Sequence, residues 1–357
     1  MTEEPLPAAL SAEINRVLDD AGVHTDRRLV WRMLRTAVKL GEDGTSRLDL
    51  KIASAALAEM RDAFRLFAPY QGIPKVTVFG SARTRQDDPL YPHARDVAAA
   101  LAAAGWMVVT GAGPGIMQAA AEGAGSRMSL GVSIRLPFEE KANQIVSENA
   151  HVVAMKYFFT RKLMLMKESR GFICLPGGFG TMDEMFELLT LQQTGKAEPM
   201  PIVLLDAPGG TFWSGLKTFV DEHLIPAGVV SPDDLDRVLI TDSVEAAVAD
   251  ITGFWRNYDS LRWVGDQLVL RLVHEPTDAE IADLNDRFGD LCAQGAIERT
   301  EALPVERADG DAVHLPRLTL HLEQRAVGRL YTLIRAIDAL PPAGSDVDQA
   351  ATTTRLS

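Results

Sequence analysis

The chain has 357 residues, of which 46% are hydrophobic, and its formal net charge is −13. This length suits one large domain with extensions or two domains, and the apolar content supports a sizeable core. The acidic balance disfavours nucleic acid as a partner, because nucleic-acid binding rests largely on neutralising phosphates.

Residues 1–70 are predicted to form helices. Apolar residues recur there at three- and four-residue steps, which indicates one buried stripe along a helix. The stripe consists of Leu50, Ala53, Leu57, Met60, Phe64 and Phe67. An earlier helical pattern begins near Thr25, and Pro69 with the segment 72–74 ends this region.

From Lys75 to residue 256, short apolar runs alternate with helical patterns. Strands are predicted at 76–79, 106–109, 131–134, 152–154, 172–175, 202–205 and 238–240, and helices at 97–104 and 243–256. Such alternation predicts an α/β fold, in which a parallel sheet is covered by helices on both faces. Ligands of such sheets bind beyond the carboxyl ends of the strands.

Beyond residue 258 the pattern changes to that of a small α+β unit. Strands are predicted at 268–272 and 318–320, with a helix around 323–338. Thr277 and Glu280 have the spacing of a capping box at the start of another helix. The predicted organisation is therefore a helical extension (1–70), an α/β domain (75–256), an α+β extension (258–340) and a flexible tail (341–357).

Two glycine-rich turns directly follow predicted strands, so both should lie at the ligand-binding edge of the sheet. In the turn 177–180, bare backbone N–H groups and a helix N-terminus would meet, which suits a phosphate. Glu184 lies one turn into that helix, where Thr181-x-x-Glu184 also has capping-box spacing, so the local sequence leaves capping and chemistry open. In the turn 111–115 the third glycine falls one residue early for a dinucleotide fingerprint. Alone, this segment could be a strand-to-helix connection without a ligand, but together with the second glycine turn it favours a shared mononucleotide cleft.

The segment Gly-Gly-x-Gly-Thr-x-x-Glu at 177–184 resembles the signature of the LONELY GUY (LOG) family, phosphoribohydrolases often mislabelled as lysine decarboxylases. Three more elements match that family in order: Phe-Gly-Ser at 79–81, the glycine-rich segment 109–117, and Phe-Phe-Thr-Arg-Lys at 158–162. The resemblance covers roughly 75–255, and the extensions make the chain similar to longer bacterial members. It implies a Rossmann-like, doubly wound sheet and a homodimer or higher even oligomer.

The resemblance also implies roles for particular residues. Glu184 would be the catalytic carboxylate and Arg161 its cationic partner. The remaining residues would bind the phosphate or the nucleotide: Gly177, Gly178, Gly180, Thr181, Ser81, Gly111, Gly113 and Gly115, with Lys162 and Glu187 nearby. The implied reaction is hydrolysis of the N-glycosidic bond of a nucleoside 5′-monophosphate, such as AMP or a cytokinin riboside monophosphate. A carboxylate can stabilise the ribosyl cation of that reaction while a fixed phosphate positions the sugar.

Other functions remain open at this stage. A non-catalytic nucleotide-binding regulator, or a carrier of the molybdenum-cofactor type, would use the same turns, and the extensions could make the chain mainly an interaction protein. We expect no cofactor and no metal, because the seven histidines lack metal-ligand spacing. The chain is predicted to be cytoplasmic and not to bind membranes: it has two cysteines, no recognisable leader and no apolar run of ~18 residues.

Overall fold

A computed structural model of the chain describes residues 6–135, 151–323 and 327–341. Contacts divide the chain into two units, Met1–Asp62 and Ala63–Ser357, with the boundary inside helix α3 (Arg47–Phe67). The tail predicted over 341–357 lies outside the described residues except for Pro341. No helix in the described ranges is both long and apolar enough to cross a membrane.

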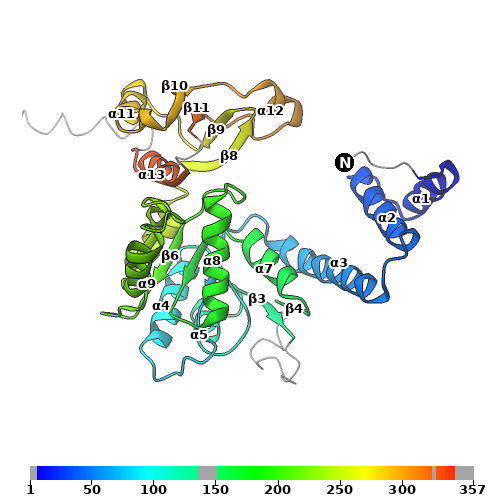
Figure 1. The fold of residues 1–357 in the computed structure, drawn as a ribbon, viewed down its shortest axis with the longest axis horizontal. Helices are drawn as coiled ribbons and strands as arrows, with labels where there is room; N and C mark the ends of the chain where they lie inside the picture. The colour runs from blue at the N-terminus through cyan, green and yellow to red at the C-terminus, as the bar shows by residue number, and fades with distance from the viewer. Residues whose placement is uncertain (1–5, 136–150, 324–326, 342–357) are drawn as a thin grey trace, which may run out of the picture. The chain divides into compact units, whose positions relative to one another are not determined.

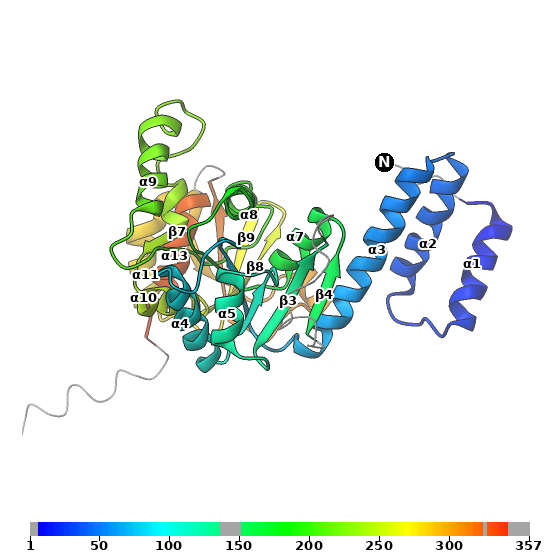
Figure 2. The ribbon, with the colours of Figure 1, turned by 90° about the horizontal axis from the view of Figure 1, so that it is seen from below.

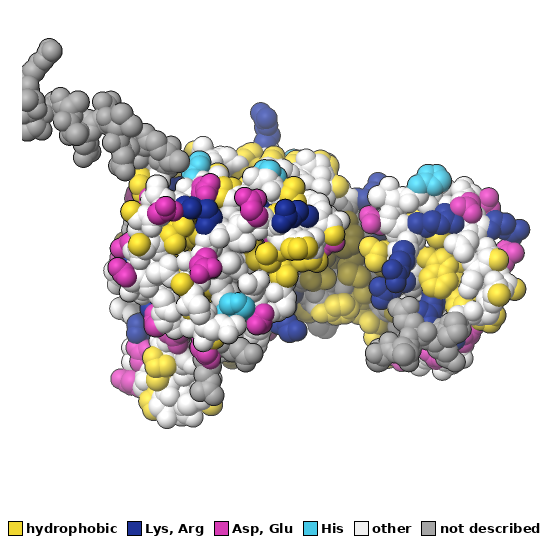
Figure 3. Space-filling view, turned by 90° about the horizontal axis from the view of Figure 1, so that it is seen from above, with side chains coloured by type: hydrophobic (Ala, Val, Ile, Leu, Met, Phe, Trp, Pro, Cys, Tyr) yellow, Lys and Arg dark blue, Asp and Glu magenta, His cyan; other side chains and the backbone are white. Residues whose placement is uncertain are grey.

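The N-terminal unit is helical, as predicted. It contains α1 (Ala8–Asp20), α2 (Arg27–Glu42) and most of α3, and its small core is formed by Leu6, Ile14 and Leu18. Helix α2 has no buried residue, and hydrophobic side chains reach the surface of this unit (Figure 3).

The stripe predicted to be buried on α3 is largely wrong. Leu50, Leu57 and Phe64 are exposed, and of the six predicted residues only Phe67 is buried. The buried residues of the helix follow Ala56 and Ala63 instead. These alanines lie roughly 100° around the helix from the leucines, so a neighbouring arc of the apolar face is the covered one.

A seven-stranded parallel sheet forms the centre of the second unit (Figure 1). Its strands, all predicted to within two residues at either end, are β1 (Lys75–Phe79), β2 (Met107–Thr110), β3 (Ser129–Ile134), β4 (Val152–Met155), β5 (Gly171–Cys174), β6 (Ile202–Leu205) and β7 (Val238–Thr241). The strand order is β4-β3-β2-β1-β5-β6-β7. Chain order therefore reverses direction between β1 and β5, which is where sheets of this kind bind ligands.

Helices cover both faces of this sheet, which confirms the doubly wound α/β prediction (Figure 2). One face packs against α4 (Leu90–Ala103), α5 (Ile116–Ala124) and α10 (Val244–Gly253). The other face meets α7 (Phe158–Lys167) and α8 (Phe179–Gln193), and α9 (Phe212–Phe219) follows β6. Helix α4 starts seven residues before its predicted beginning, because Pro92 lies in its first turn, where a missing N–H costs little.

A four-stranded antiparallel sheet follows, in the order β10-β11-β9-β8. Its elements are β8 (Tyr258–Val264), β9 (Gln267–Leu272), α11 (Asp278–Phe288), β10 (Cys292–Arg299), α12 (Pro304–Asp309), β11 (Arg317–Leu322) and α13 (Val327–Asp338). The capping box of Thr277 and Glu280 is present at the start of α11, as predicted. Strands β8 and β10 were not predicted: both are edge strands with register shifts, and β10 is mostly exposed, so neither shows a regular apolar alternation.

Candidate active site

The candidate site lies at the reversal of strand order. Strands β1 and β5 are hydrogen-bonded neighbours, and the chain beyond them leads to Ser81 and to the turn 176–178. A Cβ placed on Gly177 would overlap the Thr181 hydroxyl and lie 3.1 Å from the Ser81 nitrogen. The turns after the two strands are therefore in close contact, and only glycine fits at position 177.

The first glycine-rich turn packs against the same point. The N–H of Ile116 donates to the Ser81 carbonyl at 3.1 Å. Gly115, at the N-cap of α5, has φ +69°, and a Cβ there would overlap that same carbonyl. Gly113 instead faces the Met117 side chain. The structure thus brings the predicted residues Ser81, Gly115 and Gly177 together.

Helix α8 begins in the turn 177–180, which was predicted to bind a phosphate. Gly178 is its N-cap and Met182 N–H donates to the Gly178 carbonyl, so the N–H groups before Met182 have no partner inside the helix. Gly178 and Gly180 are exposed, and a Cβ on either would meet nothing within 4 Å. The turn leaves open space in front of unpaired N–H groups and the positive end of the helix dipole, the arrangement that binds anions.

This geometry removes the capping interpretation of Thr181 and Glu184. The helix begins at Phe179, so Thr181 lies inside its first turn, and no side chain caps the N-terminus. Both side chains are buried, at 6% and 5% exposure. Glu184 faces the interior of the site rather than the backbone of its own helix.

Glu184 and Arg161 meet across α8 and α7. Arg161 Nη1 lies 3.8 Å from Glu184 Oε1, and the second oxygen, Oε2, is buried with no hydrogen-bond partner among the described residues. Arg161 Nε donates to the carbonyl of Val132 on β3 at 3.0 Å. A Cβ on Gly111 would overlap the Arg161 guanidinium, so the glycine makes room for that cation.

Burial dominates the electrostatics of this pair. Loss of hydration raises the pKa of Glu184 to about 7, although the positive charges of Arg161 and Lys162 favour its ionised form. Burial also lowers the pKa of Arg161, while the charge of Glu184 opposes that shift. A carboxyl that titrates near neutrality, with one oxygen free, can hold a proton, a hydroxyl group or a water molecule.

Lys162 and Glu187 come together with each other rather than with Arg161. The Lys162 ammonium forms an ion pair with Glu187 and another, at 2.9 Å, with Asp183. Burial alone would lower the pKa of Lys162, but hydrogen bonds to Glu187 and Asp183 raise it. The Glu187 carboxylate is therefore paired beside the site, not a solvated helix charge.

Sequence reasoning misplaced or missed several neighbours of the site. Phe158 at the start of α7 is 57% exposed, whereas Met164, Leu165 and Met166 on the same helix are buried. Phe179, between the two exposed glycines of the turn, is 96% exposed. The Val132 carbonyl that holds Arg161 could not be found from sequence, because any strand residue presents the same group.

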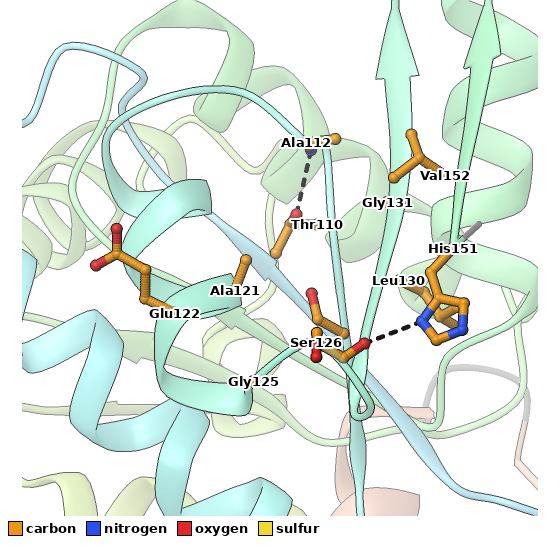
Figure 4. A pocket seen from close by; sticks show the side chains of 11 residues that line it. Thr110, Ala112, Ala121, Glu122, Gly125, Ser126, Leu130, Gly131, His151 and Val152 are labelled. Atoms are coloured by element: carbon orange, nitrogen blue, oxygen red, sulfur yellow. Dashed lines mark hydrogen bonds between the residues drawn. The ribbon is translucent and has the colours of Figure 1, made fainter. Parts of the chain in front are cut away.

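A separate cavity of about 190 Å³ lies between α5 and strands β3 and β4 (Figure 4). His151 Nδ1 donates to the Ser126 carbonyl at 3.0 Å, so its Nε2 accepts from the Tyr70 hydroxyl at 2.9 Å. Thr110 and Ala112 line the cavity and flank Gly111, but none of the predicted site residues does. Within the described ranges, no group of three or more His, Cys, Asp or Glu side chains could hold a metal ion.

Comparison with known proteins finds a matching family model and relatives of similar sequence. A family model described as "Possible lysine decarboxylase" matches residues 115–251. Cytokinin riboside 5′-monophosphate phosphoribohydrolase of Mycobacterium tuberculosis is 33% identical over 159 residues, which is 43% of this chain and 81% of the relative. The protein of that name from Mycobacterium marinum is 31% identical over 168 residues, 45% and 86% of the two chains.

Among solved structures, the molybdenum cofactor binding protein of Rippkaea orientalis is 21% identical, with a TM-score of 0.37, covering 50% of this chain and 96% of that one. The sequence relatives decide the assignment, because they are more than 30% identical to this chain and the alignments cover 81% and 86% of their length. The chain belongs to the LOG family, the family of the cytokinin riboside 5′-monophosphate phosphoribohydrolases.

Proposed function

We propose that this chain hydrolyses the N-glycosidic bond of a nucleoside 5′-monophosphate. Water supplies its oxygen to the anomeric carbon of the ribose, the C–N bond breaks, and the base leaves with a proton, which yields ribose 5-phosphate. The observation that carries the proposal is the Glu184 carboxyl, which is buried, has one unpartnered oxygen and lies in the helix that starts at the anion-binding turn.

The phosphate is proposed to bind at the N-terminus of α8. Gly178 and Gly180 leave the backbone accessible there, and the N–H groups of the first turn can donate to phosphate oxygens. Anchoring the 5′-phosphate at this point fixes the sugar relative to Glu184, about one and a half turns further along the helix. A nucleoside without the phosphate would lack that anchor.

Glu184 is proposed to stabilise the positive charge that develops on the ribose and to orient the attacking water. Both tasks need the ionised carboxylate, which the nearby Arg161 favours at 3.8 Å. Arg161 itself is oriented by Val132 and by the space at Gly111, so we assign it to positioning Glu184 and the substrate. The pairing of Lys162 with Glu187 and Asp183 adds a second, outer layer of charges.

The substrate class follows from the relatives. The proteins from M. tuberculosis and M. marinum are named for cytokinin riboside 5′-monophosphates, and we infer such a nucleotide or AMP as the substrate here. We also infer a cytoplasmic location, where nucleoside monophosphates are present. A purely non-catalytic binding role gains no support from these names.

We further propose that the enzyme works as a dimer or a higher even oligomer. Phe158, Phe159 and Leu163 on α7 and Phe186 on α8 are more than 40% exposed, which leaves an apolar surface beside the site. A two-fold contact would cover this surface. Met164 and Met166 are core residues and take no part in it.

The test is the release of ribose 5-phosphate from AMP and from a cytokinin riboside monophosphate, with the dephosphorylated nucleosides in parallel. We expect product from a monophosphate only, loss of that product in Glu184→Gln, and parental rates in Glu245→Gln, an exposed carboxylate on α10. Nucleotide binding without any product, or parental rates in Glu184→Gln, would contradict the proposal.

A further inference from the structure

Three segments of the chain meet at the start of α8. They follow β1, β2 and β5 and comprise residues 80–83, 111–117 and 175–182. Ser81 joins them, because its nitrogen lies beside Gly177 and its carbonyl accepts the N–H of Ile116 at 3.1 Å. Only one residue in the three segments carries a positive side chain, and that residue is Arg83.

The charged groups already placed in the site give a phosphate little compensation. Helices α7 and α8 contribute two cations and three carboxylates, which pair with each other: Arg161, Lys162, Asp183, Glu184 and Glu187. A phosphate monoester carries roughly −1.5 to −2 charges at pH 7, whereas the positive end of a helix dipole is equivalent to only about +0.5. Binding of a phosphate at the start of α8 therefore calls for a further cation.

Arg83 is placed for that role and its side chain is available. Its backbone N–H donates to the Ser81 hydroxyl at 3.1 Å, which fixes the start of the loop after β1. The Arg83 side chain is exposed, and its guanidinium pairs with no group of the residues that the structure describes. The next cation along the loop, Arg85, is already held in an ion pair with Asp87 at 3.2 Å.

We infer that the guanidinium of Arg83 binds the phosphate at the N-terminus of α8. It donates to the phosphate oxygens from the loop after β1, while the N–H groups in the first turn of α8 donate from the other side. The planar guanidinium can form two parallel hydrogen bonds with one phosphate. The inference rests on the anion-binding part of the proposed function and adds the cation that selects a phosphorylated nucleoside.

The test compares Arg83→Gln with Arg85→Gln, a matched change two residues further along the same loop. Both side chains are exposed, so both variants should keep the parental melting temperature in circular dichroism. In calorimetry with inorganic phosphate and with ribose 5-phosphate, Arg83→Gln should bind roughly 10-fold more weakly, and Arg85→Gln should bind as the parent does. Arg83→Lys keeps the charge without the planar fork, so its affinity should lie between those of Arg83→Gln and the parent.

Steady-state kinetics add a measurement that a structural role would not change in this way. A contact with the phosphate is present both before and during the reaction, so Arg83→Gln should raise KM for the monophosphate roughly 10-fold while kcat stays close to the parental value.

Equal phosphate affinity in Arg83→Gln and the parent, or an equal loss of affinity in Arg85→Gln, would overturn the inference. A parent that binds no phosphate would overturn it as well. Phosphate binding that depends on Arg83, without any release of ribose 5-phosphate from a monophosphate, would support the inference and contradict the proposed hydrolysis.

Discussion

Two buried glutamates of this chain each lie beside arginine, and they differ in almost every other respect. Glu184 in the candidate site has its nearest guanidinium at 3.8 Å and one oxygen without a partner. Glu306 on α12 is fully buried and receives hydrogen bonds from Arg271 at 2.7 and 3.1 Å and from Arg317 at 3.2 Å. The Glu184 carboxylate therefore has too few hydrogen-bond donors (it is under-coordinated), whereas the Glu306 carboxylate has its hydrogen-bonding capacity filled (it is saturated).

Their pKa shifts run in opposite directions for that reason. Burial raises the pKa of Glu184 to about 7, because too few donors compensate the lost hydration. Burial alone would also raise the pKa of Glu306, but hydrogen bonds from the Leu303 N–H and from Arg271, together with the charge of Arg317, hold it below its ordinary value. Asp311 extends this network through Arg271, at 2.6 Å.

The comparison separates two uses of a buried charge. A saturated carboxylate such as Glu306 fixes α12 to the antiparallel sheet and has no capacity left for a ligand. An under-coordinated one such as Glu184 costs stability in the free protein and keeps an acceptor available for substrate or water. Substitutions at the two glutamates should therefore affect activity at Glu184 and stability at Glu306.

The largest effect is expected from Glu184→Gln on catalysis. The amide fills the same space but cannot carry the charge that stabilises a ribosyl cation, so kcat should fall by roughly 10²–10³-fold or more. Ribose 5-phosphate release under saturating substrate measures this. The melting temperature should not fall, since a neutral side chain replaces a poorly compensated charge. A large loss of both activity and stability would show that Glu184 is structural, like Glu306.

The mirror experiment is Glu306→Gln. Removing this charge leaves Arg271 and Arg317 buried with less compensation, and we expect the free energy of unfolding to drop by about 3–5 kcal/mol. Urea denaturation followed by circular dichroism measures the drop. At temperatures where the variant is fully folded, kcat should remain parental. An unchanged denaturation midpoint would mean that the network around Glu306 contributes nothing to folding.

A smaller effect concerns the pH dependence of stability. The pKa of Glu184 in the folded state, about 7, lies above its ordinary value of 4.5, so the folded protein binds this proton more tightly than the unfolded chain does. Its contribution to stability therefore falls as pH rises from about 4.5 to 7, by at most about 3 kcal/mol, and stays constant above that range. Relative to the parent, Glu184→Gln should gain stability between pH 5 and pH 8. A difference between the two proteins that is independent of pH would place the pKa of Glu184 near its ordinary value.

The strands of the central sheet and the position of the two glycine-rich turns at its edge could be predicted, because both depend on local sequence patterns. Buried parallel strands appear as apolar runs, and Gly115 and Gly177 stand where the backbone approaches Ser81 too closely for any other residue. The local sequence left capping open for Thr181 and Glu184, and the structure excludes it because the helix begins at Phe179, earlier than its polar residues indicate. The state of Glu184 could not be predicted, since it depends on which donors from α7 and β3 reach it.

The prediction of the buried face of helix α3 was wrong for a different reason. Its apolar arc is wider than one neighbour can cover, and a hydrophobic period shows that a face will be buried without showing by what. The apolar period wrongly predicted Leu50 and Leu57 as core residues, although both are exposed. Edge strands β8 and β10 were not predicted, because register shifts break the alternation of apolar and polar residues on which a strand prediction relies.

The smallest effect expected on the fold comes from Gly178→Ala, paired with Gly177→Ala as its control. A Cβ on Gly178 meets nothing in the structure, and the residue has an extended backbone, with φ −85°. The variant should therefore lose no more than about 1 kcal/mol of stability, the range of a change at an N-cap. Because that Cβ would occupy the space in front of the N–H groups of α8, affinity for inorganic phosphate and for ribose 5-phosphate should fall, as calorimetry can measure.

In the control variant Gly177→Ala, the new carbon would overlap Thr181, so this variant should lose stability first. Equal phosphate affinity in Gly178→Ala and the parent would move the anion site away from this turn, and with it the anchor that places the ribose beside Glu184.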